Sequence, residues 1–200
     1  MVATSNPFGF QAAAHLSGGV IRQKYRQNGI ASGFATAIFT GTPIKNTATD
    51  GTLIPCTTGA DTALGVFQGC EFTDTAGVFH ISPFWPASQA YQTTLQNGAG
   101  VANMQAYYTD DPNILYDVQA NGSVPQSGIG QAANLANTSQ GSTFTGLSTQ
   151  SLNATLTGAT PGLCRIIDIP EGSYFSGGVN AAGDAFTIVR VQFTYQPVVA

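Results

Sequence analysis

Short apolar runs, each ended by glycine, proline or asparagine, recur along this chain and constrain its fold more than any other feature. Residues 114–119 alternate and stop at Asn121-Gly122, a strong turn dipeptide, and residues 78–81 stop at Ser82-Pro83. Similar strand patterns cover residues 33–39, 63–71, 102–108, 163–169 and 185–195. We therefore expect an all-β fold, an antiparallel β-barrel or sandwich.

Helical patterns are weak. Only residues 11–16 and 131–136 show a helix-like period, and each predicts at most one helical turn. Gly65 and Gly69 interrupt the apolar run 63–71, which predicts a β-bulge or a close approach of two backbones. The last strand has no purely polar face, so we expect it to be covered on both sides.

The length of 200 residues predicts one domain with an arm. We assign residues 1–30 to an extended N-terminal arm and residues 31–200 to the β domain. That domain includes a polar loop excursion at 122–162, which is low in charge and has Phe144 as its one aromatic residue. The arm has two interpretations: it is an anchor that gains order on docking, or it packs on its own domain.

Charged residues are scarce, at 8% where about 25% is usual. A compact chain of this mass exposes roughly 8,900 Å², so such a surface suits a protein whose faces are covered by partners or one that acts outside the cytoplasm. The net charge of −4 argues against a nucleic-acid partner. No apolar stretch is long enough to span a membrane, and the first residues lack the regions of a secretory signal.

Arg22, Lys24 and Arg26 alternate in a short basic stripe. This stripe is either the solvated face of a strand or a contact for an acidic protein partner.

Residues for catalysis or for metal and cofactor binding do not form a recognisable set. His15 and His80 are the two histidines, and we interpret His80 as a packed, hydrogen-bonded side chain of a strand. The segment Asp110-Asp111-Pro112 predicts a turn, with a weak calcium contact or a catalytic pair as alternatives. Cys56, Cys70 and Cys164 have no metal-site spacing and suit small buried side chains. We expect no enzyme, no metal and no cofactor.

Several segments in order carry a family resemblance: Asn6-Pro7-Phe8-Gly9-Phe10, Leu16-Ser17-Gly18-Gly19, Leu64 to Asp74, Phe84-Trp85-Pro86-Ala87, Tyr107, Asp110-Asp111-Pro112-Asn113, Tyr116 to Gly122, and Gly141-Ser142-Thr143 with Gly146-Leu147-Ser148. Together they resemble the capsid decoration, or cement, proteins of tailed bacteriophages. The resemblance covers residues 6–148.

This resemblance implies a non-enzymatic virion protein that binds the outer capsid surface between major capsid proteins and stabilises the head. It further implies a barrel or β-tulip fold, a homotrimer, synthesis in the cytoplasm of a bacterial host and a place on the capsid exterior. We expect the arm to supply the capsid contact, through Pro7, Phe8, Gly9, Phe10, Leu16, Ile21, Arg22, Lys24, Tyr25 and Arg26.

A receptor- or glycan-binding module of a virion fibre or cell surface is the alternative. Trp85, Tyr107 and Tyr108 would then line a groove, unless they are core aromatics. A glycan hydrolase of β architecture is a third hypothesis, and the missing pair of acids counts against it.

Overall fold

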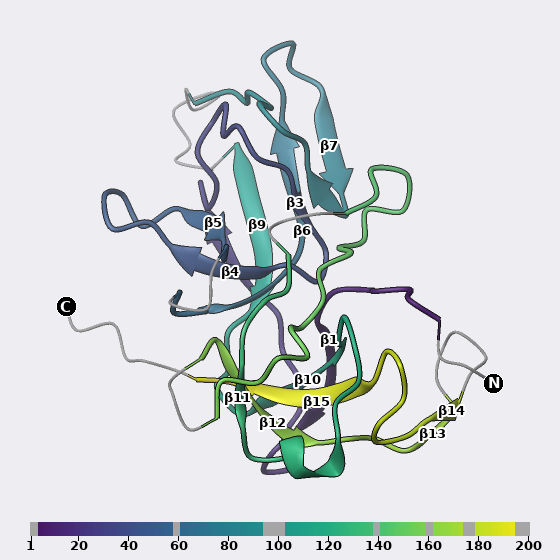
Figure 1. Cartoon of the computed structure of the whole chain (residues 1–200). Coiled ribbons are helices and arrows are strands. Elements are labelled where there is room, and N and C mark those ends of the chain that lie inside the picture. Colours follow the sequence, from purple (N-terminus) through teal and green to yellow (C-terminus); the bar gives the residue numbers. More distant parts are fainter. Residues whose placement is uncertain are drawn as a thin grey trace.

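The fold is built almost entirely from antiparallel strands, which confirms the predicted fold class. A computed structural model describes residues 4–57, 61–93, 103–137, 141–158, 162–173 and 179–194. Two larger sheets dominate, and in Figure 1 the six-stranded sheet lies above the five-stranded sheet.

The five-stranded sheet contains the strongest strand patterns of the sequence. Its order is β1 (Gln11–His15), β10 (Ile114–Gln119), β15 (Ile188–Phe193), β12 (Cys164–Asp168) and β11 (Ala132–Ala133). Every residue of β10 is buried, so this central strand is covered on both faces. On the face away from the core, Arg190 Nε donates to Asp117 Oδ1 at 2.8 Å across the β10–β15 pair.

The six-stranded sheet curls back on itself. Its path is β2 (Lys24–Gln27), β9 (Met104–Thr109), β6 (Gly65–Thr73), β4 (Pro43–Asn46) and β5 (Leu53–Pro55), and β7 (Phe79–Ser82) pairs with β6 off this path. Leu53 N donates to Gly29 O at 2.6 Å, so β5 meets the chain that follows β2. The described strands of this sheet remain an open path rather than a closed ladder.

Two short strand pairs and a 3₁₀ turn complete the described part of the chain. β3 (Ile38–Phe39) pairs with β8 (Phe84–Trp85), and β13 (Gly172–Ser173) pairs with β14 (Val179–Asn180). A single 3₁₀ turn, η2, spans Gln126–Gly128. The predicted helical turns at 11–16 and 131–136 are wrong, because these residues form β1 and β11. Pairing with β10 and β12 overrides the helix propensity of their alanines.

One bent ribbon joins the two sheets. β1 pairs with β10 in the lower sheet and β2 pairs with β9 in the upper one, so two chain segments run antiparallel from sheet to sheet. They bend where β9 passes into β10, and there Lys24 Nζ lies 3.0 Å from Asp110 Oδ2. At the same bend His15 Nε2 lies 3.2 Å from Asp111 Oδ2.

The glycines of β6 have the two roles predicted for them. A Cβ at Gly65 would lie 1.7 Å from Thr109 O, so only glycine lets β6 and β9 approach this closely. Gly69 has a φ of 126° at the point where the β6–β9 register shifts, which is a β-bulge.

Two hydrophobic cores fill the molecule. The first packs on the five-stranded sheet around Tyr116, Phe193 and Phe10, and the second fills the curl of the six-stranded sheet around Trp85, Phe72 and Phe67. Burial of this apolar surface is the main stabilising contribution to such a fold.

The polar segment 122–162 is part of the fold. Its Val124, Ala133 and Leu152 are buried in the first core. Leu152 forms a bridge with Ala120 of the lower sheet, and Leu147 forms one with Thr40 beside β3. The segment therefore straps one sheet to the other instead of projecting as a free loop.

The N-terminal arm is shorter than residues 1–30. Residues 4–10 form no strand and precede β1, whereas β1 and β2 belong to the two sheets. Phe10 is fully buried, and its ring stacks on Phe193 with centroids 5.5 Å apart. The structure shows no domain boundary at residue 30. The chain continues from β2 into the second core, where Ile30 is buried.

We predict that Phe10→Ala lowers the free energy of unfolding by about 3–5 kcal/mol, because it removes a buried ring from the first core. Chemical denaturation followed by circular dichroism measures this loss. The control is Val20→Ala, at a side chain that is 76% exposed, where we expect a change within about 0.5 kcal/mol. A Phe10→Ala protein as stable as this control would contradict the packing described here.

Candidate functional site

The outer surface of the six-stranded sheet carries a continuous row of side chains. Gln27 faces Gln105 across β2 and β9, Gln105 faces Glu71 across β9 and β6, and Glu71 faces Ile81 across β6 and β7. Directly opposed residues lie on the same face of a sheet. The row therefore crosses four strands.

A second set of residues extends this row on the same face. Tyr25 faces Tyr107 across β2 and β9, and Thr73 faces Phe79 across β6 and β7. The alternating residues Phe72, Met104 and Tyr108 point into the second core, so this row lies on the side away from it. We call this surface the outer face and define it by Tyr25, Gln27, Glu71, Thr73, Phe79, Ile81, Gln105 and Tyr107.

The outer face is apolar at both ends and holds one charged residue, Glu71. Ile81 is 78% exposed, Tyr25 is 60% exposed and Phe79 is 58% exposed. The solvated face of an antiparallel sheet is usually polar, whereas tyrosine and phenylalanine are enriched, and lysine and glutamate depleted, in protein–protein contacts. This composition is typical of a surface that another molecule covers.

β7 forms an unpaired border of the outer face. In the part of the chain that the structure describes, β7 pairs with β6 alone, which leaves the backbone groups of its other edge unpaired within the sheet. Such an edge offers hydrogen bonds to a further extended chain.

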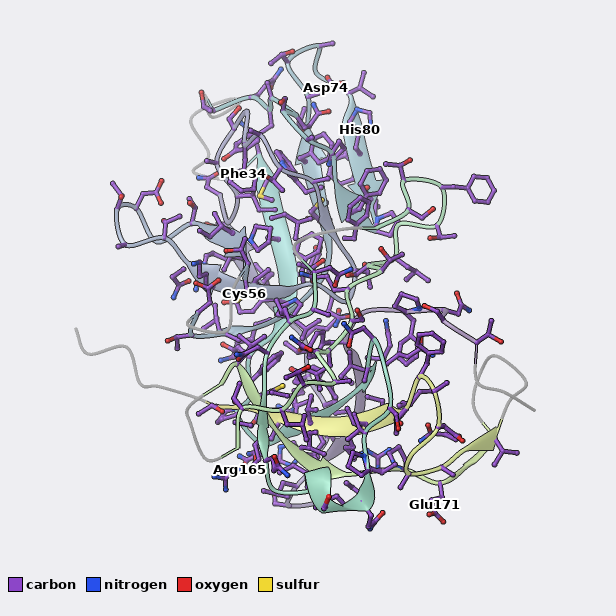
Figure 2. The ribbon with its side chains drawn as sticks, in the orientation of Figure 1. Phe34, Cys56, Asp74, His80, Arg165 and Glu171 are labelled. Carbon is purple, nitrogen blue, oxygen red and sulfur yellow. The ribbon has the colours of Figure 1, made fainter. Side chains whose placement is uncertain are left out.

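The β6–β7 hairpin holds its shape through Asp74 and His80, which lie together at the far end of the upper sheet in Figure 2. Asp74 Oδ1 accepts hydrogen bonds from Ala76 N and Val78 N, both at 2.9 Å, and Asp74 Oδ2 lies 2.9 Å from His80 Nε2. The His80 ring also stacks on Phe72. The prediction of a packed, hydrogen-bonded His80 is confirmed, and its role is to fix β7.

Glu71 is tied to Tyr107 within the outer face. Burial raises the pKa of the Tyr107 phenol, and the hydrogen bond and charge of Glu71 raise it further. The one carboxylate of the face is thus already partnered by the neighbouring phenol.

The ten residues predicted to contact a partner do not share one surface. Gly9 and Phe10 are buried, Ile21 packs against the first core, and Pro7 and Phe8 are half-buried. These five positions contribute to the chain's own fold, as expected for an arm that packs on its own domain.

The basic stripe is mostly engaged within the chain. Arg26 donates to Asn46 Oδ1 at 2.6 Å and to Gly51 O at 2.7 Å, and its guanidinium lies over the Tyr108 ring. Lys24 is exposed but pairs with Asp110, which raises the pKa of its ammonium group. Arg22 is exposed.

Of the remaining predicted residues, Leu16 and Tyr25 expose apolar side chains, at 55% and 60%. Tyr25 alone belongs to the outer face. Phe79 and Ile81 were missed, although the alternation Phe79-His80-Ile81 is the signal of a strand with two different faces.

Asp110 and Asp111 form the predicted turn. Asp111 Oδ1 accepts from Asn113 N at 2.9 Å, and this bond, together with that of His15, lowers the pKa of Asp111. His15 Nδ1 accepts from Ser17 N at 3.3 Å and from Gly19 N at 3.2 Å, so its Nε2–H is the atom that donates to Asp111. These groups hold the bend of the ribbon.

The aromatic groove of the glycan-binding alternative does not form from the residues expected to line it. Trp85 and Tyr108 are 0% and 5% exposed and belong to the second core. Tyr107 lies on the opposite face of the strand, in the outer face.

The three cysteines are free and buried, as predicted. Burial raises the pKa of the Cys56 and Cys70 thiols to about 12. Among the described residues, no three histidine, cysteine or acidic side chains gather as ligands for a metal ion. The same part of the chain contains no helix with the length and hydrophobicity that a membrane span requires.

Comparisons with protein families, with curated proteins and with solved structures found no match to this chain.

We predict that Glu71→Gln lowers the pKa of Tyr107 towards 10.0, without reaching it because the burial of the phenol remains. Titration of the tyrosine ring carbons by NMR measures the shift. Asp74→Asn is the control, since Asp74 does not contribute to the pKa of Tyr107. An unchanged pKa in Glu71→Gln would remove the described link between the two side chains.

Proposed function

We propose that this protein is a non-enzymatic structural protein of a tailed-bacteriophage virion, which binds the outer surface of the capsid and stabilises the head. The outer face is the observation that carries this proposal. It is a sheet surface with exposed apolar groups and a single, already partnered charge. The resemblance to capsid decoration proteins supplies the class of partner, the major capsid protein.

The outer face suits contact with another folded protein surface. Completely burying a side chain such as Phe79 or Ile81 contributes roughly 1.5–3 kcal/mol. A few such contacts give weak attachment for one subunit after the cost of association. A homotrimer would bind several capsid subunits at once, so these weak contacts would sum to tight attachment.

Scarce charge supports the same proposal. Of the six basic residues, Lys24, Lys45 and Arg190 form ion pairs within the chain, and Arg26 is held by neutral groups. Few charges remain to keep copies of the protein apart or to steer it towards nucleic acid.

We predict that Ile81→Lys abolishes most binding to heads, because it places a charge on the apolar end of the outer face. Heads assembled without this protein are mixed with purified variants and sedimented, and the bound fraction is measured. Val179→Lys is the matched control, since Val179 is 66% exposed on β14. Equal binding of the Ile81→Lys protein would place the contact elsewhere, and no binding of the unaltered protein would refute the proposed function.

We predict a homotrimer, with a mass three times that of the 20.6 kDa chain, in solution or on the head. A standard interface removes about 800 Å² from each partner, and two such contacts per subunit would cover much of the sparsely charged surface. Light scattering of the free protein and counting of subunits on purified heads measure the state. A monomer in both settings would contradict this prediction.

A further inference from the structure

A tight loop at residues 141–148 presents one aromatic side chain. Gly141 bridges Ser148 across the base of the loop, Ser142 N donates to Leu147 O at 3.0 Å, and Gly146 N donates to Ser142 O at 2.7 Å. Thr145 N donates to Ser142 Oγ at 3.3 Å as well. These bonds cross-link the loop, so its tip has a defined shape.

The loop is also fixed to the body of the protein. Thr40 N donates to Gly146 O at 3.0 Å, and Ser148 N donates to Thr40 O at 2.8 Å. Gly146 has a φ of 73°, and a Cβ there would lie 2.4 Å from Pro83 Cγ, immediately after β7. In Figure 1 this loop lies beside β7, the border strand of the outer face.

Phe144, at the tip, is 97% exposed. It is not an isolated surface side chain, because Leu147 in the same loop and Val78, Phe79 and Ile81 of the adjacent hairpin are also exposed. These five are a majority of the exposed large hydrophobic residues in the described part of the chain. Exposed apolar side chains on two neighbouring segments are typical of an interaction surface.

A side chain held ready in this way loses little conformational freedom when it binds. Central aromatic anchors that fill a pocket contribute a large share of binding energy, and pre-organisation reduces the entropic cost of their immobilisation. The loop combines an aromatic anchor with pre-organisation. It presents one phenyl ring on a backbone that hydrogen bonds hold at the base of the loop and against Thr40.

We propose that Phe144 is an anchor that inserts into an apolar pocket of the partner protein, next to the contact made by the outer face. This inference rests on the proposed function, since the partner is the capsid surface. It adds a mode of recognition: a surface contact through the sheet and a pocket contact through the loop.

Charge favours a protein pocket over a lipid surface. Residues 122–162 contain no lysine, arginine, aspartate or glutamate, and the whole chain has a net charge of −4. Loops and helices that insert into membrane surfaces usually carry basic residues that are attracted to anionic lipids. The Phe144 loop has no such group.

The experiment measures binding of three variants to heads assembled without this protein. We expect Phe144→Ala to weaken binding roughly 10- to 100-fold, the equivalent of losing one buried phenyl ring, with an unchanged melting temperature because the ring is exposed. Gly146→Ala should also weaken binding, since the loop must move away from Pro83. Val20→Ala, which removes an exposed apolar group elsewhere, should bind like the unaltered protein.

A fluorescence measurement tests insertion directly. In a Phe144→Trp protein with Trp85 replaced by phenylalanine, acrylamide should quench the new tryptophan in the free protein and lose access to it on heads. If the unaltered protein binds heads and Phe144→Ala binds equally well, the anchor is wrong and the proposed function stands. If the unaltered protein does not bind, the proposed function fails. If the protein binds phosphatidylcholine–phosphatidylglycerol vesicles and Phe144→Ala abolishes this binding, the proposal that Phe144 enters a protein pocket is wrong.

Discussion

The bent ribbon formed by β1–β2 and β9–β10 determines how the two sheets are placed. Its two segments pair with each other in the lower sheet and again in the upper one, so the bend between the two paired stretches sets how the sheets are placed. The bend is held by Lys24 on Asp110, by His15 on Asp111 and by a buried hydrogen bond of 2.9 Å between Tyr116 and Thr109. The backbone of Thr109 also touches β6 at Gly65, where no side chain fits. Three of the sixteen charged residues of the chain, Lys24, Asp110 and Asp111, lie at this bend.

The placement of the ionisable side chains also affects the outer face. Ion pairs and hydrogen bonds at the bend, in the β6–β7 hairpin and on β10–β15 engage a large part of the ionisable side chains within the chain. The outer face is left with Glu71, which is bonded to Tyr107. A surface without free charge attracts a partner mainly through apolar contact and backbone hydrogen bonds. The same sheet that buries Trp85 and Phe72 on its inner side therefore offers Phe79 and Ile81 on its outer side.

Local pattern predicted the strands well and the alanine-rich segments poorly. The alternation at residues 114–119 and the apolar run at 63–71 correspond to β10 and β6, because side chains of period two suit a pleated strand wherever it pairs. Residues 11–15 have no such pattern, and their strand exists because β10 supplies a partner. The same limit of local pattern applies to Phe10, which we expected at the capsid contact and which is buried in the first core. An aromatic residue near the start of a chain suits a docking pocket and a core equally well.

Local residue chemistry was enough to predict the antiparallel β class, the scarcity of surface charge, and a β-bulge or a close backbone approach at the glycines of the run 63–71. Pairing of β6 with β9 then gave Gly65 the close approach and Gly69 the bulge. Which side of each strand faces a core depended on the tertiary structure. Alternation shows that Phe79 and Ile81 share a face, but the β6–β7 pairing and the curl of the sheet turn that face outwards. The position of Phe144 was decided in the same way, because the hydrogen bonds to Thr40 and the contact with Pro83 come from segments about 60 to 100 residues away. These contacts join segments that are far apart in the sequence, so no local pattern encodes them.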